Sequence, residues 1–175
     1  MKSRTGFISN SSSTSFVVAI PSSVKCECAL RQIMFPERKG SCGHPESKGP
    51  CGHDSNGFST REAAGDVWQE MQFPDHRLDT REKAIEALCK GHCPGVELDD
   101  FKMPLGPGKS QEFDWDGYSS AIKHWAELAY EEFLRDHPDS DLYVFEYSDN
   151  DGPFNSEMEH GDIFRNLPHI ALNNH

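Results

Sequence analysis

Residues Phe16-Val17-Val18-Ala19-Ile20 form an unbroken apolar run, and Pro21 ends it. A strand with one face in water alternates apolar and polar residues, whereas a strand covered on both faces is apolar throughout. We therefore predict a strand here with packing layers on both sides. Residues 142–147, rich in aromatic and β-branched side chains, and residues 167–172 are predicted strands that pair with each other in an antiparallel hairpin.

In the middle of the chain, apolar residues recur at the spacing of an α-helix. A capping box, Ser59-x-x-Glu62, opens the first helix, and Pro74 closes it. The predicted helices cover residues 59–74, 79–91 and 118–135. Together with the strands they predict an α+β fold, in which a small, mainly antiparallel sheet packs against two or three helices.

The sequence of residues 24–35 is compatible with either a strand or a helix. In a strand Cys26 and Cys28 share a face, whereas in a helix their side chains point roughly 200° apart. Binding of one metal ion by both sulfurs favours the extended form. We therefore expect an extended segment if these cysteines are ligands.

A Cys- and Gly-rich loop at 36–58 repeats one tripeptide, as Cys42-Gly43-His44 and Cys51-Gly52-His53. A loop of this length inside a compact domain needs a tether. Structural zinc takes four tetrahedral nitrogen or sulfur ligands, supplied as two pairs from separate segments. The predicted zinc ligands are Cys26, Cys28, Cys42 and Cys51, with His44, His53, Cys89 and Cys93 as alternatives. Cys89 could instead fill the core beside Ile85.

At 175 residues the chain suits one domain. We predict a Ser-rich N-terminal leader at 1–15 and a single α+β domain at 16–175. No secretory signal or membrane-spanning run is present in the sequence, so we expect a cytoplasmic protein whose cysteines are metal ligands or buried thiols.

The formal charge is −12, from 29 acidic against 17 basic residues, with no basic run that could follow a phosphate backbone. Direct binding of nucleic acid is therefore not expected. Such a chain could present its carboxylates to a protein with a basic surface. The connection before the last predicted helix also carries an acidic patch, Glu97, Asp99 and Asp100.

A cluster of titratable side chains lies near the C-terminus. Glu159, His160 and Asp162 place two carboxylates beside an imidazole, which could serve general acid/base chemistry or hold a catalytic metal. No nucleophile elbow, His-Glu-x-x-His pair or phosphate-binding loop accompanies them. A small metal-dependent hydrolase is therefore an alternative function.

The N-terminal segment Arg4-x-Gly6-Phe7-Ile8-Ser9-Asn10-Ser11-Ser12-Ser13-x-Ser15-Phe16 resembles a signature of uncharacterised bacterial and phage proteins. The tail is similar to the ending of such proteins, in Phe-Glu-Tyr-Ser-Asp-Asn-Asp-Gly at 145–152, Glu-His-Gly-Asp at 159–162 and Arg-Asn-Leu-Pro-His-Ile at 165–170. The resemblance implies a microbial setting and no known activity. We expect a non-enzymatic, zinc-stabilised module that binds or regulates another protein; a further alternative is an assembly protein that docks through its N-terminal arm.

Overall fold

The computed structural model describes residues 13–36, 60–90, 96–103, 113–148, 154–155, 158 and 163–173. These residues form an α+β fold with a three-stranded antiparallel sheet and four α-helices. The elements are β1 (Ser13–Pro21), α1 (Glu27–Met34), α2 (Thr60–Glu70), α3 (Arg81–Leu88), the 3-10 helix η1 (Leu98–Phe101), α4 (Trp115–Asp136), β2 (Ser140–Ser148) and β3 (His169–Asn173). The predicted fold class, the three strands and the three helices are confirmed, with shifts of a few residues at their ends.

The apolar strand β1 lies at the centre of the sheet, because the strand order is β2-β1-β3. Both neighbours pair with it antiparallel, with Val18 opposite Tyr143 on one side and His169 on the other. The predicted hairpin between the second and third strands is therefore wrong. The strand with no polar face takes the central position, where β2 and β3 pair with both of its edges and helices cover both of its faces.

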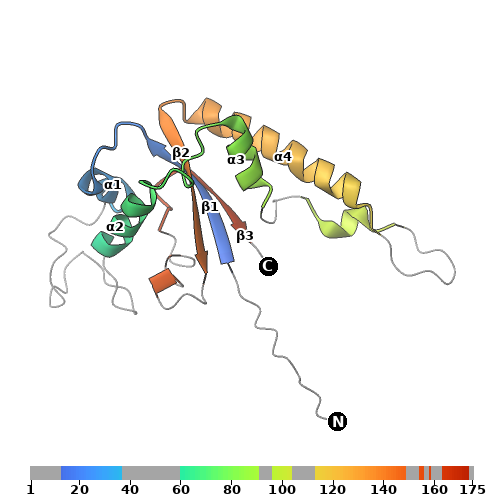
Figure 1. The fold of residues 1–175 in the computed structure, drawn as a ribbon, viewed down its shortest axis with the longest axis horizontal. Coiled ribbons are helices and arrows are strands. Elements are labelled where there is room, and N and C mark those ends of the chain that lie inside the picture. Colours follow the sequence, from blue (N-terminus) through green and yellow to red (C-terminus); the bar gives the residue numbers. More distant parts are fainter. Residues whose placement is uncertain are drawn as a thin grey trace, which may run out of the picture.

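Side chains of β1 alternate between two cores, one on each face of the sheet. Phe16, Val18 and Ile20 pack with α1 and α2, whereas Val17 and Ala19 pack with α3 and α4. Figure 1 shows the two pairs of helices on opposite sides of the strands. The prediction of a strand covered on both faces is confirmed, as all five residues from Phe16 to Ile20 are buried.

β1 also reaches further back than predicted, into the segment assigned to the leader. Ser13 pairs with Ser148, and the side chains of Thr14 and Ser15 are buried. Pairing with the whole length of β2 extends the strand through these polar residues. Residues 1–12 of the predicted leader lie outside the described residues.

The ambiguous segment around the first two cysteines is a helix, which corrects the extended form that metal binding favoured. α1 begins at Glu27, and Cys26 is its N-cap with extended backbone angles. Leu30 and Met34 are completely buried against the first core, one turn apart on the same helix face. Their burial determines the helix, because an extended segment would point these two residues in the same direction but much further apart.

The segment between α2 and α3 adds to the outer edge of β2. The Leu78 amide donates to the Leu142 carbonyl (2.9 Å), and the Val144 amide donates to the His76 carbonyl (2.8 Å). Arg77 pairs opposite Tyr143 and contacts Asp141 at 2.9 Å. These bonds hold the His76 ring beside Phe145, 6.3 Å between ring centroids, and so against the end of α2.

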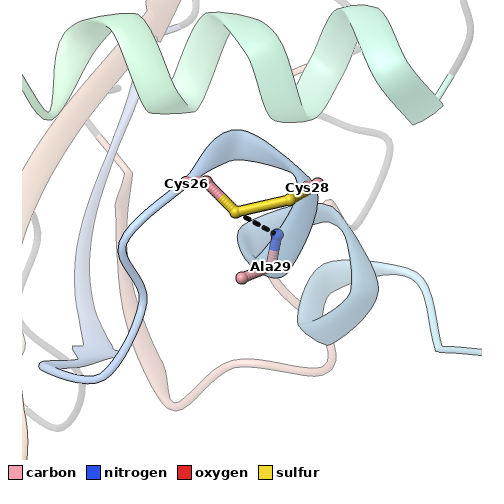
Figure 2. The surroundings of a disulfide bond; sticks show 3 residues. All are labelled: Cys26, Cys28 and Ala29. Atoms are coloured by element: carbon pink, nitrogen blue, oxygen red, sulfur yellow. Dashed lines mark hydrogen bonds between the residues drawn. A yellow bond between two sulfur atoms is a disulfide. The ribbon is translucent and has the colours of Figure 1, made fainter.

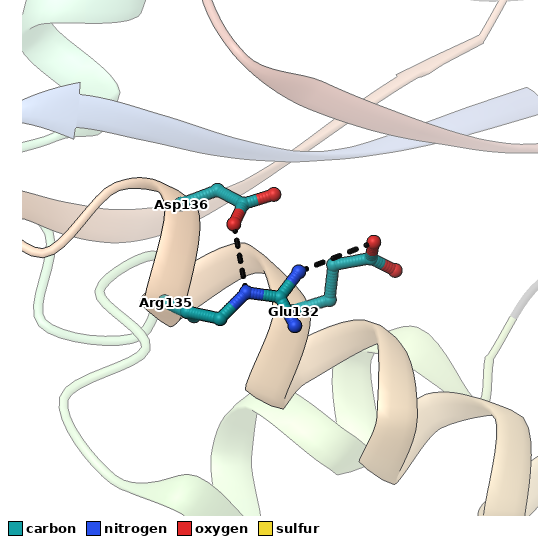
Figure 3. Close-up of polar contacts among 3 residues, drawn as sticks. All are labelled: Glu132, Arg135 and Asp136. Atoms are coloured by element: carbon teal, nitrogen blue, oxygen red, sulfur yellow. Dashed lines mark hydrogen bonds and ion pairs between the residues drawn. The ribbon is translucent and has the colours of Figure 1, made fainter.

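α4 is the longest helix, and only Ala126 among its side chains is fully buried. Near its C-terminus the Arg135 guanidinium contacts Asp136 at 2.9 Å and Glu132 at 3.4 Å (Figure 3). These exposed pairs contribute little stability, although a cation at a helix C-terminus is favourable. None of the helices in the described ranges combines the length and apolar composition needed to cross a bilayer.

Because β1 is covered on both faces, we expect substitutions at two adjacent residues, one facing each core, to destabilise the fold equally. Val17→Ala and Val18→Ala should each lower the free energy of unfolding by about 2 kcal/mol, because each removes buried methyl groups from a different core. Urea unfolding monitored by circular dichroism measures both losses. A loss at one position with almost none at the other would show that one face of β1 is open to water.

Candidate functional site

Most of the predicted site residues lie outside the described residues. This holds for Cys42, His44, Cys51, His53 and Cys93 of the proposed zinc site, and for the alternative catalytic residues Glu159, His160 and Asp162. Among the residues that the structure describes, no group of three or more His, Cys, Asp or Glu side chains could hold a metal ion. The zinc site and the hydrolase site therefore stay predictions.

The structure does bring Cys26 and Cys28 together, and their sulfurs form a disulfide (Figure 2). Because Cys26 stands outside the helix as its N-cap, its side chain turns back over the first turn toward Cys28. The Cys26 Sγ also accepts a hydrogen bond from the Ala29 amide at 3.4 Å. In this disulfide form neither sulfur is the thiolate that zinc binding requires.

Cys89, an alternative zinc ligand, is a free thiol at the end of α3. It packs partly buried against the second core, beside the residues that α3 supplies. Burial raises the pKa of this thiol; the nearby Lys123 charge opposes that shift, and the Glu127 charge adds to it. Its position agrees with the core-filling alternative.

A cluster of titratable side chains that the sequence did not reveal lies between α2 and β2. Asp66 and Glu70 are one turn apart on α2, and the Tyr147 hydroxyl donates to Asp66 Oδ2 at 3.4 Å. The His76 Nδ1 lies 3.3 Å from Glu70 Oε2. Apart from this contact, neither of these two buried atoms has a polar partner among the described residues.

Burial shifts the pKa values of the acidic side chains in this cluster. Desolvation, followed by the charges of Asp66 and Glu146, raises the pKa of Glu70 from 4.5 to about 7. Desolvation also raises the pKa of Asp66, although the Tyr147 hydrogen bond opposes that shift. The buried Tyr147 hydroxyl has its pKa raised well above the ordinary value, so it stays protonated and keeps donating.

The Glu70 carboxyl can therefore take up or release a proton near neutral pH. The atoms of its contact with His76 are shielded, since Glu70 Oε2 and His76 Nδ1 are both buried. This suits a contact that responds to pH better than catalysis on a bound substrate, which needs the acid or base within reach of the substrate. A pocket of about 170 Å³ beside α3 is lined by other residues, among them Lys83, Lys90 and Glu86.

A third feature is an exposed surface where η1 meets the start of α4, which we name the aromatic–acidic surface. Its members are Phe101, Phe113, Trp115, Tyr118, Glu97, Asp99, Asp100 and Asp116. Trp115 lies 5.5 Å from Phe113 and 6.3 Å from Tyr118, between ring centroids, and Phe101 lies 5.4 Å from Tyr118. Although it contacts two other rings, Trp115 is 60% exposed.

Local bonds hold this surface in shape. The Asp114 side chain caps α4 by accepting from the Gly117 amide at 2.9 Å, and the Asp114 amide donates to the Phe101 carbonyl at 3.0 Å. Any side chain at position 117 would collide with the capping carboxyl, so the absence of a Cβ at Gly117 permits the cap. An antiparallel bridge between Lys102 and Phe113 completes the connection of η1 to α4.

The four carboxylates of this surface are exposed, and Lys102 forms an ion pair with Asp99. Within the described ranges no cation lies at ion-pair distance from Glu97, Asp100 or Asp116. At the other end of α4, Arg135 and Arg81 contact acidic side chains. Negative charge is therefore less compensated at the aromatic end of α4.

The raised pKa of Glu70 predicts a pH-dependent stability. A carboxyl that binds its proton more tightly in the folded protein than in the unfolded chain stabilises fully below about pH 4.5, and this contribution is lost as pH rises through about 7. Between pH 5 and 8 the wild type should lose on the order of 1–2 kcal/mol relative to Glu70→Gln, whose amide does not ionise. Thermal unfolding at each pH measures the difference. The exposed Glu86→Gln on α3 is the control; a Glu70→Gln profile parallel to the wild type would contradict the shift.

No protein-family model, curated protein or solved structure matches this chain significantly.

Proposed function

We propose that this protein is an interaction module that binds a partner protein through the aromatic–acidic surface. The observation that carries the proposal is the exposed Trp115 ring, held in a cluster of aromatic side chains on the surface to which the exposed acidic residues of η1 and the start of α4 belong. The proposed partner presents an apolar pocket for the indole, bordered by Lys or Arg side chains.

The aromatic side chains of this surface support a role in binding. An exposed Trp or Tyr that other groups hold in place loses little conformational freedom on binding, and both residue types are enriched among the residues that dominate binding energy. The Trp115 ring is held by its contacts with Phe113 and Tyr118 and is still largely open to solvent. Figure 1 places the start of α4 away from the sheet, so that the strands do not obstruct a partner there.

The negative charge of this surface also supports a role in binding. The formal charge of the chain is −12, and Glu97, Asp100 and Asp116 are exposed residues of η1, its N-cap and the first turn of α4. Such a surface attracts a basic partner, raises the rate of encounter and repels other acidic proteins. We therefore assign the predicted contact with a basic protein to the aromatic–acidic surface.

The aromatic–acidic surface is held by the Asp114 cap and by contacts between aromatic rings. Zinc binding by the loop at 36–58, hydrolysis at Glu159, His160 and Asp162, and docking through the N-terminal arm concern residues outside the described ranges. They remain separate hypotheses.

Trp115→Ala should weaken partner binding at least about tenfold, because it removes the largest exposed ring of the surface. The full chain, immobilised, would first be used to isolate a partner from cells that express it naturally, and the purified partner would then be titrated in solution. Binding should also weaken as salt rises, because the complementary charges are exposed.

Phe73→Ala is the matched control, because Phe73 is 59% exposed and lies at the end of α2, outside the surface. It should leave the dissociation constant unchanged. Equal losses in both variants, or binding that neither Trp115→Ala nor salt alters, would contradict the proposal. Light scattering that shows self-association, abolished by Trp115→Ala, would identify a second copy of the chain as the partner and contradict a basic one.

A further inference from the structure

The disulfide between Cys26 and Cys28 is open to solvent, since both residues are exposed at the start of α1. Glu27, between them, turns the other way: its carboxyl group lies against α2, within 3.8 Å of the place where a Cβ on Gly65 would stand. Figure 2 shows the two sulfurs side by side on the first turn of the helix. A reactant can therefore approach this disulfide without any opening of the core.

The position of this disulfide argues against a mainly structural role. A disulfide stabilises a fold by restricting the unfolded chain, and the effect is smallest when the closed loop is short. Here only one residue separates the two cysteines. α1 is held independently of the disulfide, because Leu30 and Met34 are fully buried against the first core.

The start of the helix also favours one sulfur as a thiolate. Cys26 Sγ accepts the hydrogen bond of the Ala29 amide, and the N-terminus of an α-helix stabilises negative charge. A sulfur stabilised in this way is the better leaving group in thiol–disulfide exchange. Cys28, inside the first turn, has no such bond among those that the structure describes.

We propose that Cys26 and Cys28 form a redox-active pair whose substrate is a dithiol, in a protein or a small molecule. A thiolate of the dithiol attacks Cys28 Sγ, the Cys26–Cys28 bond breaks, and Cys26 leaves as the stabilised thiolate. The second thiol of the substrate, once deprotonated, attacks the substrate sulfur of the mixed disulfide and expels Cys28. The substrate becomes a disulfide and gives up two electrons and two protons; the pair gains both as two thiols. This activity is additional to the binding proposed for the aromatic–acidic surface.

The test equilibrates the full chain with glutathione buffers of increasing reducing strength, followed by quenching with acid, alkylation of free thiols and mass spectrometry of the peptide that contains both cysteines. We expect a reversible change of this peptide from disulfide to two alkylated thiols, with an unchanged circular dichroism spectrum. Site-specific detection separates this pair from the other four cysteines. A pair that stays in one state across the buffers, or reduction that unfolds the chain, would overturn the proposal.

Single variants test the assigned roles. Ser is a preferred N-cap residue, so Cys26→Ser should fold normally. With dithiobis(nitrobenzoate) below neutral pH, Cys26 in the Cys28→Ser variant should react on the order of tenfold faster than Cys28 in the Cys26→Ser variant, because more of it is thiolate. Equal rates would overturn the role of Cys26. In a last experiment, zinc alone is added to the reduced chain. Binding of one equivalent of zinc through these cysteines, with loss of exchange with glutathione, would establish a metal site instead of a redox-active pair.

Discussion

The structure depends on the requirement that β1 be covered on every side. Its apolar residues alternate between two cores, so that neither face can be left in water. This requirement places β2 and β3 on its two edges and one pair of helices on each face. The segment before β3 also contributes, because the Phe164 ring packs 5.2 Å from both Phe16 and Phe145. The aromatic–acidic surface and the Cys26–Cys28 disulfide lie outside this core, whereas the Asp66–Glu70 cluster reaches it through the buried Tyr147.

The sequence allowed the elements to be predicted where the signal is local. Alternation, capping and helical spacing act over a few residues, and α2, α3 and α4 followed them closely. The order of the strands depends on which edges meet in three dimensions, and the hairpin prediction was wrong for that reason. α1 was obscured by a competing interpretation, since the spacing of Cys26 and Cys28 was weighed as ligand geometry while the burial of Leu30 and Met34 was not.

The candidate sites were less predictable. Asp66 and Glu70 stand four residues apart on one helix, a spacing visible in the sequence, but their partners His76 and Tyr147 arrive from a loop and a distant strand. The acidic patch at 97–100 was noted in the sequence, whereas the connection of η1 to the start of α4 depends on the backbone bridge between Lys102 and Phe113. A cysteine as N-cap was not anticipated, because Ser, Thr, Asp and Asn dominate that position.

The strand order has a consequence for biosynthesis. β1 leaves the ribosome more than a hundred residues before β2 and β3, the two strands that protect its edges. Until then an apolar segment with strong β propensity is exposed, and such segments promote aggregation during slow, non-local folding. The nascent chain is therefore expected to need shielding by a chaperone, and translation that stops before residue 140 should yield insoluble protein.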